Sequence, residues 1–147
     1  MNITGKTLSF SVLAMAVLLN SAVRAQDVVV VANPGVLITT VTSAQLRDIF
    51  TGVHSTFPDR SRAVPVTLKG GPVHEVFLRN HLGETPDGFR TFWRKLLFSG
   101  QGVPPKEFAS EAALLQFVAE TPGAIGYVSR VSDGVNVKVL VVQRNSR

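Results

Sequence analysis

The chain has 147 residues, of which 45% are hydrophobic, and a formal net charge of +5. This length fits one domain built around one core. Because the chain contains no cysteine, disulfide-stabilised scaffolds and cysteine-ligated metal sites are excluded. The basic residues form neither a block nor an aromatic-basic motif, so we expect no nucleic-acid partner.

The N-terminal segment has the pattern of a secretory signal peptide. Lys6 precedes an apolar run over residues 8–19, and small residues precede a cleavage site after Ala25. An uncleaved anchor is the less favoured alternative, since a membrane span needs about 20 apolar residues. We expect a signal peptide over residues 1–25 and a single domain over residues 26–147. Without a cysteine to carry a lipid anchor, the mature domain should be soluble in the periplasm.

The first part of the mature domain alternates strand and helix patterns. A continuous valine-rich run over residues 27–33 predicts a strand that is buried on both faces. Thr42 and Gln45 have the spacing of a capping box, which opens a helix, and Gly52 ends that helix. Residues 63–68 alternate and are β-branched, which predicts a second strand.

Glycine and proline mark the next two helices. The Gly-Gly-Pro turn at residues 70–72 leads into a predicted helix over residues 73–82. A threonine cap followed by proline, Thr85-Pro86, begins the next helix. Its apolar residues recur with helical spacing, so we expect all of them to face the core: Phe89, Phe92, Trp93, Leu96 and Leu97.

The last part of the chain contains a third helix pattern between two strand signals. Ser110-Glu111 opens this helix, which ends before Pro122. Residues 124–128 and 135–142 are the last predicted strands, and Gly126 within the first of them indicates close approach by a neighbour. Strands that alternate with helices define an α/β fold with a mixed or mostly parallel sheet flanked by helices.

Three motifs, taken in order, resemble a known family. They are residues 29–34 (VVVANP), 46–52 (LRDIFTG) and 122–128 (PGAIGYV). Their order and spacing are similar to those of the periplasmic phosphate-binding proteins of ABC transporters, and more closely to the short single-lobe members of that superfamily. The resemblance covers residues 28–128 and implies one lobe of a type II periplasmic-binding-protein-like fold.

The turn after the second strand departs from the phosphate-binding pattern of that family. The resemblance implies a glycine-serine-glycine-threonine turn here, but residues 68–84 contain neither serine nor threonine. Pro72 also removes one backbone donor. The candidate anion ligands that remain are the Lys69 ammonium, the His74 imidazole and several backbone N–H groups. These backbone groups belong to Gly70, Gly71, Val73 and His74.

Two interpretations of this turn stay open. It binds an anion weakly, and more strongly below about pH 6.5 as His74 becomes charged, or it is a strand-to-helix turn without a ligand. The family resemblance adds Asn33 and Tyr127 as candidates at the same cleft. Arg90, Arg94 and Lys95 have the spacing of the solvent-exposed face of a helix.

The sequence predicts no metal site, cofactor or catalytic centre. His54, His74 and His81 lack metal-ligand spacing, and no serine lies in a nucleophile elbow. The family resemblance and the export signal imply our first hypothesis, an exported, non-enzymatic solute-binding-like protein that binds phosphate or another small oxyanion weakly and serves the permease of an ABC transporter. The alternative is a protein-interaction module of the cell envelope, which kept the lobe and lost the ligand. It predicts an exposed apolar patch and a homodimer or a complex with another envelope protein.

Overall fold

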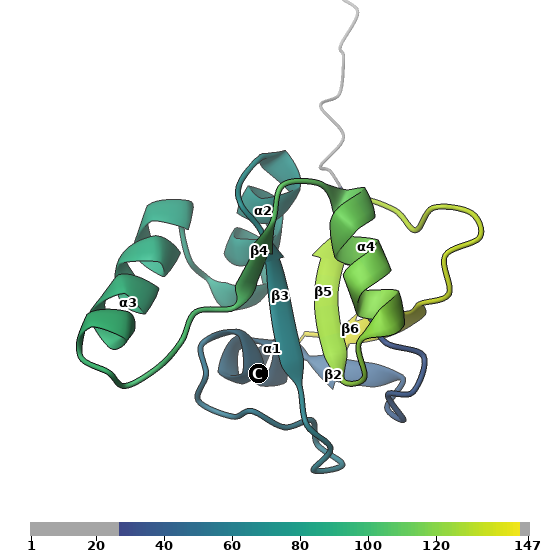
Figure 1. The fold of residues 1–147 in the computed structure, drawn as a ribbon, viewed down its shortest axis with the longest axis horizontal. Helices are drawn as coiled ribbons and strands as arrows, with labels where there is room; N and C mark the ends of the chain where they lie inside the picture. Colours follow the sequence, from purple (N-terminus) through teal and green to yellow (C-terminus); the bar gives the residue numbers. More distant parts are fainter. Residues whose placement is uncertain (1–26, 145–147) are drawn as a thin grey trace, which may run out of the picture.

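The computed structural model describes residues 27–144, so the predicted signal peptide lies outside the described residues. Figure 1 shows strands and helices alternating along the chain. The elements are β1 (Val29–Ala32), β2 (Thr40–Thr42), α1 (Ser43–Phe50), β3 (Val64–Leu68), α2 (Pro72–Phe77), the π-helical turn η1 (Leu78–Leu82), α3 (Pro86–Phe98), β4 (Lys106–Phe108), α4 (Glu111–Glu120), β5 (Ala124–Val128) and β6 (Lys138–Gln143).

The six strands form one mixed sheet in the order β2-β6-β1-β5-β3-β4. β2 pairs with β6, β3 with β4 and β3 with β5 in parallel. β1 runs antiparallel to both of its neighbours, β5 and β6, with Val31 opposite Gly126 and Val139. This arrangement confirms the predicted α/β class with a mixed sheet.

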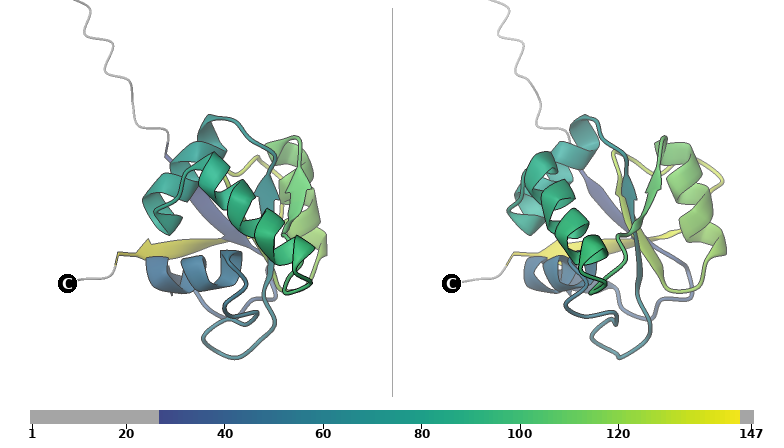
Figure 2. Two further views of the ribbon diagram at one scale, coloured as in Figure 1. Left: turned by 90° about the vertical axis from the view of Figure 1, so that its left-hand side faces the viewer. Right: turned by 60° about the vertical axis from the view of Figure 1, so that its left-hand side comes forward.

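Helices cover both faces of the sheet. Figure 2 shows α4 on one side of the strands and α1, α2 and α3 on the other. The Thr42 side chain accepts a hydrogen bond from the backbone N–H of Gln45, and the Gln45 side chain accepts one from Thr42, so the predicted capping box is confirmed. Ser110 and Thr85 cap α4 and α3 as expected.

The core lies where β5 and β1 meet the helices. Every residue of β5 is buried, and the rings of Phe77 and Tyr127 stack with their centroids 3.8 Å apart. Phe50 from α1 meets Phe77 edge-on at 4.9 Å. Gly126 leaves room for its neighbours, since a Cβ there would lie 2.9 Å from Leu114 Cδ2. The close approach predicted at Gly126 is therefore made by packed side chains.

Helix α3 differs most from its sequence prediction. Phe89 and Trp93 are buried and Leu96 is half-buried, but Phe92 is 36% and Leu97 49% exposed. The expectation that the whole apolar stripe faces the core is wrong, because α3 lies at the margin of the domain (Figure 1) and only one edge of its apolar face meets the core.

Three further details differ from the sequence predictions. The short strands β2 and β4 were not predicted, and β6 begins at Lys138 rather than at residue 135. The helix predicted over residues 73–82 is divided into α2 and η1.

Among residues 27–144, no helix is both long and apolar enough to span a membrane.

Candidate functional site

The glycine turn predicted as the anion site connects β3 to α2. Gly71 has φ 95°, a conformation that residues with side chains rarely adopt, and Pro72 begins α2. The backbone N–H of Lys69 donates to the carbonyl oxygen of Phe108 at 2.9 Å, which ties the turn to β4. Lys69, Gly70 and Gly71 are exposed, whereas Val73 and His74 are buried. The turn therefore presents its first half to solvent.

The His74 ring contacts the hydroxyl group of Tyr127 in the core. Its Nδ1 lies 2.5 Å from the Tyr127 Oη, which also accepts a hydrogen bond from the backbone N–H of Leu68 at 3.1 Å. Burial lowers the pKa of His74 below its ordinary value of 6.5, and the positive charge of Arg90 lowers it further, against a smaller opposing effect of Glu75. His74 is therefore mostly neutral at pH 7, and the protonation that was expected to strengthen anion binding below about pH 6.5 requires a lower pH.

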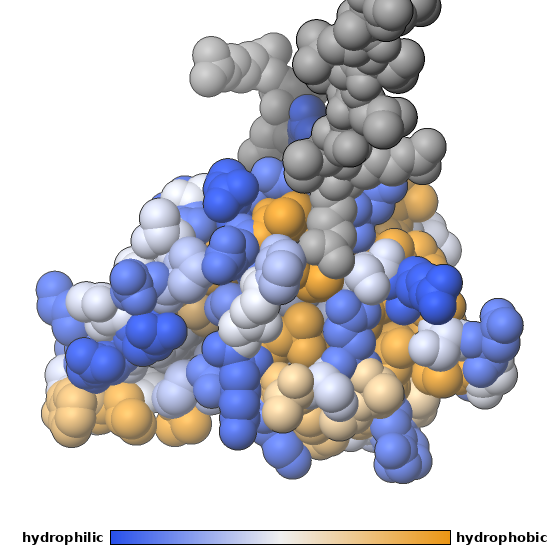
Figure 3. Space-filling view, turned by 90° about the horizontal axis from the view of Figure 1, so that it is seen from above, coloured by the Kyte–Doolittle hydropathy of each residue, from blue (hydrophilic) through white to orange (hydrophobic). Residues whose placement is uncertain are grey.

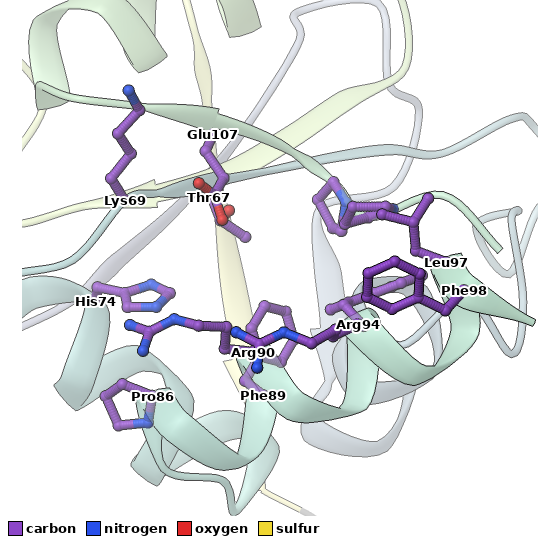
Figure 4. A pocket seen from close by; sticks show the side chains of 13 residues that line it. Thr67, Lys69, His74, Pro86, Phe89, Arg90, Arg94, Leu97, Phe98 and Glu107 are labelled. Atoms are coloured by element: carbon purple, nitrogen blue, oxygen red, sulfur yellow. The ribbon is translucent and has the colours of Figure 1, made fainter.

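A pocket of about 280 Å³ opens beside this turn, between α3 on one side and β3 and β4 on the other. Figure 4 shows Arg90 and Arg94 extending along α3 toward the end of the pocket where His74 lies. The stem of Lys69 borders the pocket, but its ammonium group points away from His74. The lining residues are Thr67, Lys69, His74, Pro86, Phe89, Arg90, Trp93, Arg94, Leu97, Phe98, Pro104, Pro105 and Glu107.

The pocket is more positive than negative. Lys69, Arg90 and Arg94 contribute three basic groups, and Glu107 contributes one acidic group. Arg90 also forms an exposed ion pair with Asp87, with 3.0 Å between Nη1 and Oδ1. Exposed pairs of this kind contribute little energy and exchange readily with other partners. The pocket can therefore offer guanidinium groups to an anion.

Arg90 and Arg94 were not among the predicted site residues, although both line the pocket. Both are exposed, as expected. They also line the pocket together with Phe89 and Trp93, instead of facing only bulk solvent. Helical spacing indicates which side of α3 is polar, but not that β3 and β4 lie opposite it. A signal was present in the alternation of arginine and aromatic residues along 89–94.

Two predicted site residues have internal roles. The Asn33 Nδ2 donates to the carbonyl oxygens of Val118 and Ala119 at 2.9 and 3.1 Å, and its Oδ1 accepts from the backbone N–H of Gly35. These bonds tie the end of β1 to the end of α4, away from the pocket. Tyr127 is fully buried, and burial raises its pKa. Of the predicted residues, only Lys69 and His74 line the pocket.

The other histidines are separate from this site. His54 contacts Asp48, with 3.2 Å between Nδ1 and Oδ2. His81 packs against Phe77, and burial lowers its pKa. In the part of the chain that the structure describes, no group of three or more histidines and carboxylates is placed to hold a metal ion.

Comparison with known structures relates this fold to transport receptors. An ABC-type phosphate transport receptor from Vibrio cholerae is similar with a TM-score of 0.57 and 16% identity, over 78% of this chain and 45% of that one. A phosphate ABC transporter substrate-binding protein from Clostridium perfringens, solved with bound phosphate, is similar with a TM-score of 0.56 and 17% identity, over 80% of this chain and 44% of that one. PstS from Borrelia burgdorferi has a TM-score of 0.56 and 16% identity, over 78% of this chain and 46% of that one. No family model and no curated protein matches the chain.

These similarities define the class of fold. The chain has the fold of phosphate ABC transporter receptors and spans less than half of their length, which corresponds to a single lobe. The resemblance that the three sequence motifs predicted is confirmed at the level of the fold.

Proposed function

We propose that this protein is an exported solute-binding protein that holds a small oxyanion, such as phosphate, in the pocket between α3 and the turn after β3. In this proposal it acts in the periplasm without catalysis and delivers its ligand to an ABC transporter permease. The receptors that share the fold support the class of function. The observation that carries the proposal is that Arg90 and Arg94 of α3 and the stem of Lys69, from the turn after β3, line one pocket.

The affinity for a bare oxyanion should be modest. An anion at an open site keeps part of its hydration, and its hydrogen bonds to the protein compete with water. The residues that line the pocket include no serine and only one threonine, Thr67. We therefore expect dissociation constants in the millimolar rather than the nanomolar range, on the order of 1 mM.

The proposal is tested by calorimetric titration of residues 26–147 with phosphate, with sulfate for comparison. A ligand at about 100 times its dissociation constant adds about 2.7 kcal/mol to the free energy of unfolding, which raises the melting temperature by several degrees. The variant Arg90→Gln/Arg94→Gln should lose this heat, because it removes the guanidinium groups that line the pocket, whereas Lys95→Gln, which removes a charge outside the pocket, should keep it. No heat from wild-type protein with either anion would contradict the proposal.

A second function is favoured by the exposed apolar residues at the end of α3. Phe98 is 83% and Val103 80% exposed, next to the half-exposed Leu97. Figure 3 shows apolar residues beside hydrophilic ones on the left of the molecule, where α3 lies. Such a patch is typical of a surface that another protein covers. Light scattering that finds a dimer, abolished by Phe98→Asp, would favour this interaction module; a strict monomer would argue against self-association.

A further inference from the structure

The pocket beside α3 has two chemically different ends. Arg90 reaches toward His74 at one end, whereas Leu97 and Phe98 lie at the other (Figure 4). Phe89 and Trp93 form the wall between them, and each is only 7% exposed. A bare inorganic anion would use the first end and leave the apolar wall in water.

The apolar end is contributed by two separate segments. Leu97 and Phe98 come from the last turn of α3, while Pro104 and Pro105 come from the loop before β4. Leu97 is 49% and Phe98 83% exposed, so these side chains still have apolar surface to bury. A pocket of about 280 Å³ lies near the lower end of small-molecule sites, which span roughly 300–1,000 Å³.

Trp93 contributes apolar ring surface to the pocket rather than a hydrogen-bonding group. Its Nε1 has essentially no exposed surface, so a molecule in the pocket would contact the ring carbons. The rings of Phe89 and Trp93 therefore act as an apolar wall beside the basic groups.

We infer that the pocket takes an amphipathic organic anion, with a phosphate or carboxylate head at Arg90 and Arg94 and an apolar body along Phe89, Trp93 and Leu97. This inference rests on the proposed solute-binding function and specifies its class of ligand. The guanidinium groups favour a planar or tetrahedral oxyanion, while Glu107 and Asp87 reduce the net positive charge at the rim. Each methylene that leaves water strengthens binding by roughly fourfold at full burial.

The test uses the fluorescence of Trp93, the only tryptophan of the chain. Residues 26–147 are titrated with n-hexyl phosphate, inorganic phosphate and 1-hexanol, none of which absorbs at the excitation wavelength. We expect saturable changes with n-hexyl phosphate and a dissociation constant at least tenfold below those of both other probes. Equal affinity for inorganic phosphate would overturn the inference but leave the proposed function intact. No binding of either phosphate would overturn both, and equal affinity for 1-hexanol would overturn the role of the charged head.

Matched variants separate the two ends of the pocket. Leu97→Ala/Phe98→Ala should weaken n-hexyl phosphate at least fivefold and leave inorganic phosphate unchanged, whereas Leu37→Ala, an exposed residue elsewhere, should change neither. Arg90→Gln/Arg94→Gln should weaken both phosphates, in contrast to Lys95→Gln. Unchanged urea midpoints establish that the variants are folded. Wild-type affinity for n-hexyl phosphate in the folded Leu97→Ala/Phe98→Ala variant would contradict the inference.

Discussion

The Oη of Tyr127 lies 2.5 Å from the Nδ1 of His74, and this contact joins the central strand β5 to α2 inside the core. The same hydroxyl oxygen accepts the backbone N–H of Leu68 at the end of β3. One side chain therefore fixes both elements that flank the glycine turn. The position of His74 at the pocket depends on this arrangement.

Removal of the Tyr127 hydroxyl should destabilise the protein. In Tyr127→Phe, the ring keeps its stacking on Phe77, but the Leu68 N–H and His74 Nδ1 lose their partner in a buried place. A buried group left without a hydrogen bond costs about 1–3 kcal/mol. Urea unfolding should register a loss of this size, while Val139→Ala at an exposed position should change the free energy of unfolding by less than about 0.5 kcal/mol. A wild-type value for Tyr127→Phe would show that the bond contributes nothing.

Two charges of opposite sign should tune the pKa of His74 in opposite directions. Arg90 lowers this pKa and Glu75 raises it. NMR titration of the His74 ring protons should therefore give a higher pKa in Arg90→Gln and a lower pKa in Glu75→Gln than in the wild-type protein. The two variants act as controls for each other, and shifts of the same sign would contradict the geometry described here.

The free energy of unfolding should depend on pH through the buried His74 and the half-buried His81. Burial lowers the pKa of both His74 and His81 below 6.5 in the folded protein. The unfolded chain therefore binds more protons between the folded pKa values and about 6.5, so the free energy of unfolding rises with pH in this window. Their contribution is fully present above about pH 6.5 and is lost as the pH falls. Urea midpoints at pH 7 and pH 5 should differ in this direction, and the difference should shrink in His81→Gln; a higher midpoint at pH 5 would refute the assignment.

Gly126 should not tolerate a side chain. A Cβ there would lie 2.9 Å from Leu114 Cδ2 and 3.0 Å from Val66 Cγ2 in the core. Overpacking of this kind costs about 1–3 kcal/mol, which Gly126→Ala should show in urea unfolding. Gly70→Ala is the matched control, because a Cβ at Gly70 meets nothing within 4 Å, and its effect should stay within about 1 kcal/mol. Equal effects of the two substitutions would count against the packing around β5.

The proposed export predicts where the N-terminal signal peptide is cleaved. Small residues precede Gln26, so signal peptidase should cleave after Ala25. Mass spectrometry of the protein recovered from the periplasm should give a chain that begins at Gln26. Replacement of Ala25 with a bulky residue, as in Ala25→Phe, should leave the precursor uncleaved. Recovery of the full-length chain in the cytoplasm from the unaltered gene would contradict the proposed export to the periplasm.

Local signals predicted much of the fold. The capping box of Thr42 and Gln45, the caps at Thr85 and Ser110 and the buried runs of β1 and β5 depend on neighbouring residues, and all are confirmed. The strands β2 and β4 could not be predicted, because each has three residues and acquires its pairing from a strand distant in the sequence.

The pocket was harder to predict from the sequence than the fold was. The amphipathic pattern of α3 identifies an apolar face but not the partner that covers it, so Leu97 and Phe98 could not be placed at a cavity. The role of Arg90 could not be predicted for the same reason. The pocket that it lines forms only because the turn after β3 lies opposite α3. The turn itself was found from its glycines, and Lys69 and His74 with it.

The most direct test of a solute site in this pocket is an NMR titration of residues 26–147 with phosphate, in which the backbone amide signals are followed. We predict saturable shifts that cluster at Lys69 and His74 and along residues 89–94 of α3, and that disappear in Arg90→Gln/Arg94→Gln. Saturable shifts that cluster elsewhere, or no shifts at millimolar phosphate, would contradict this prediction.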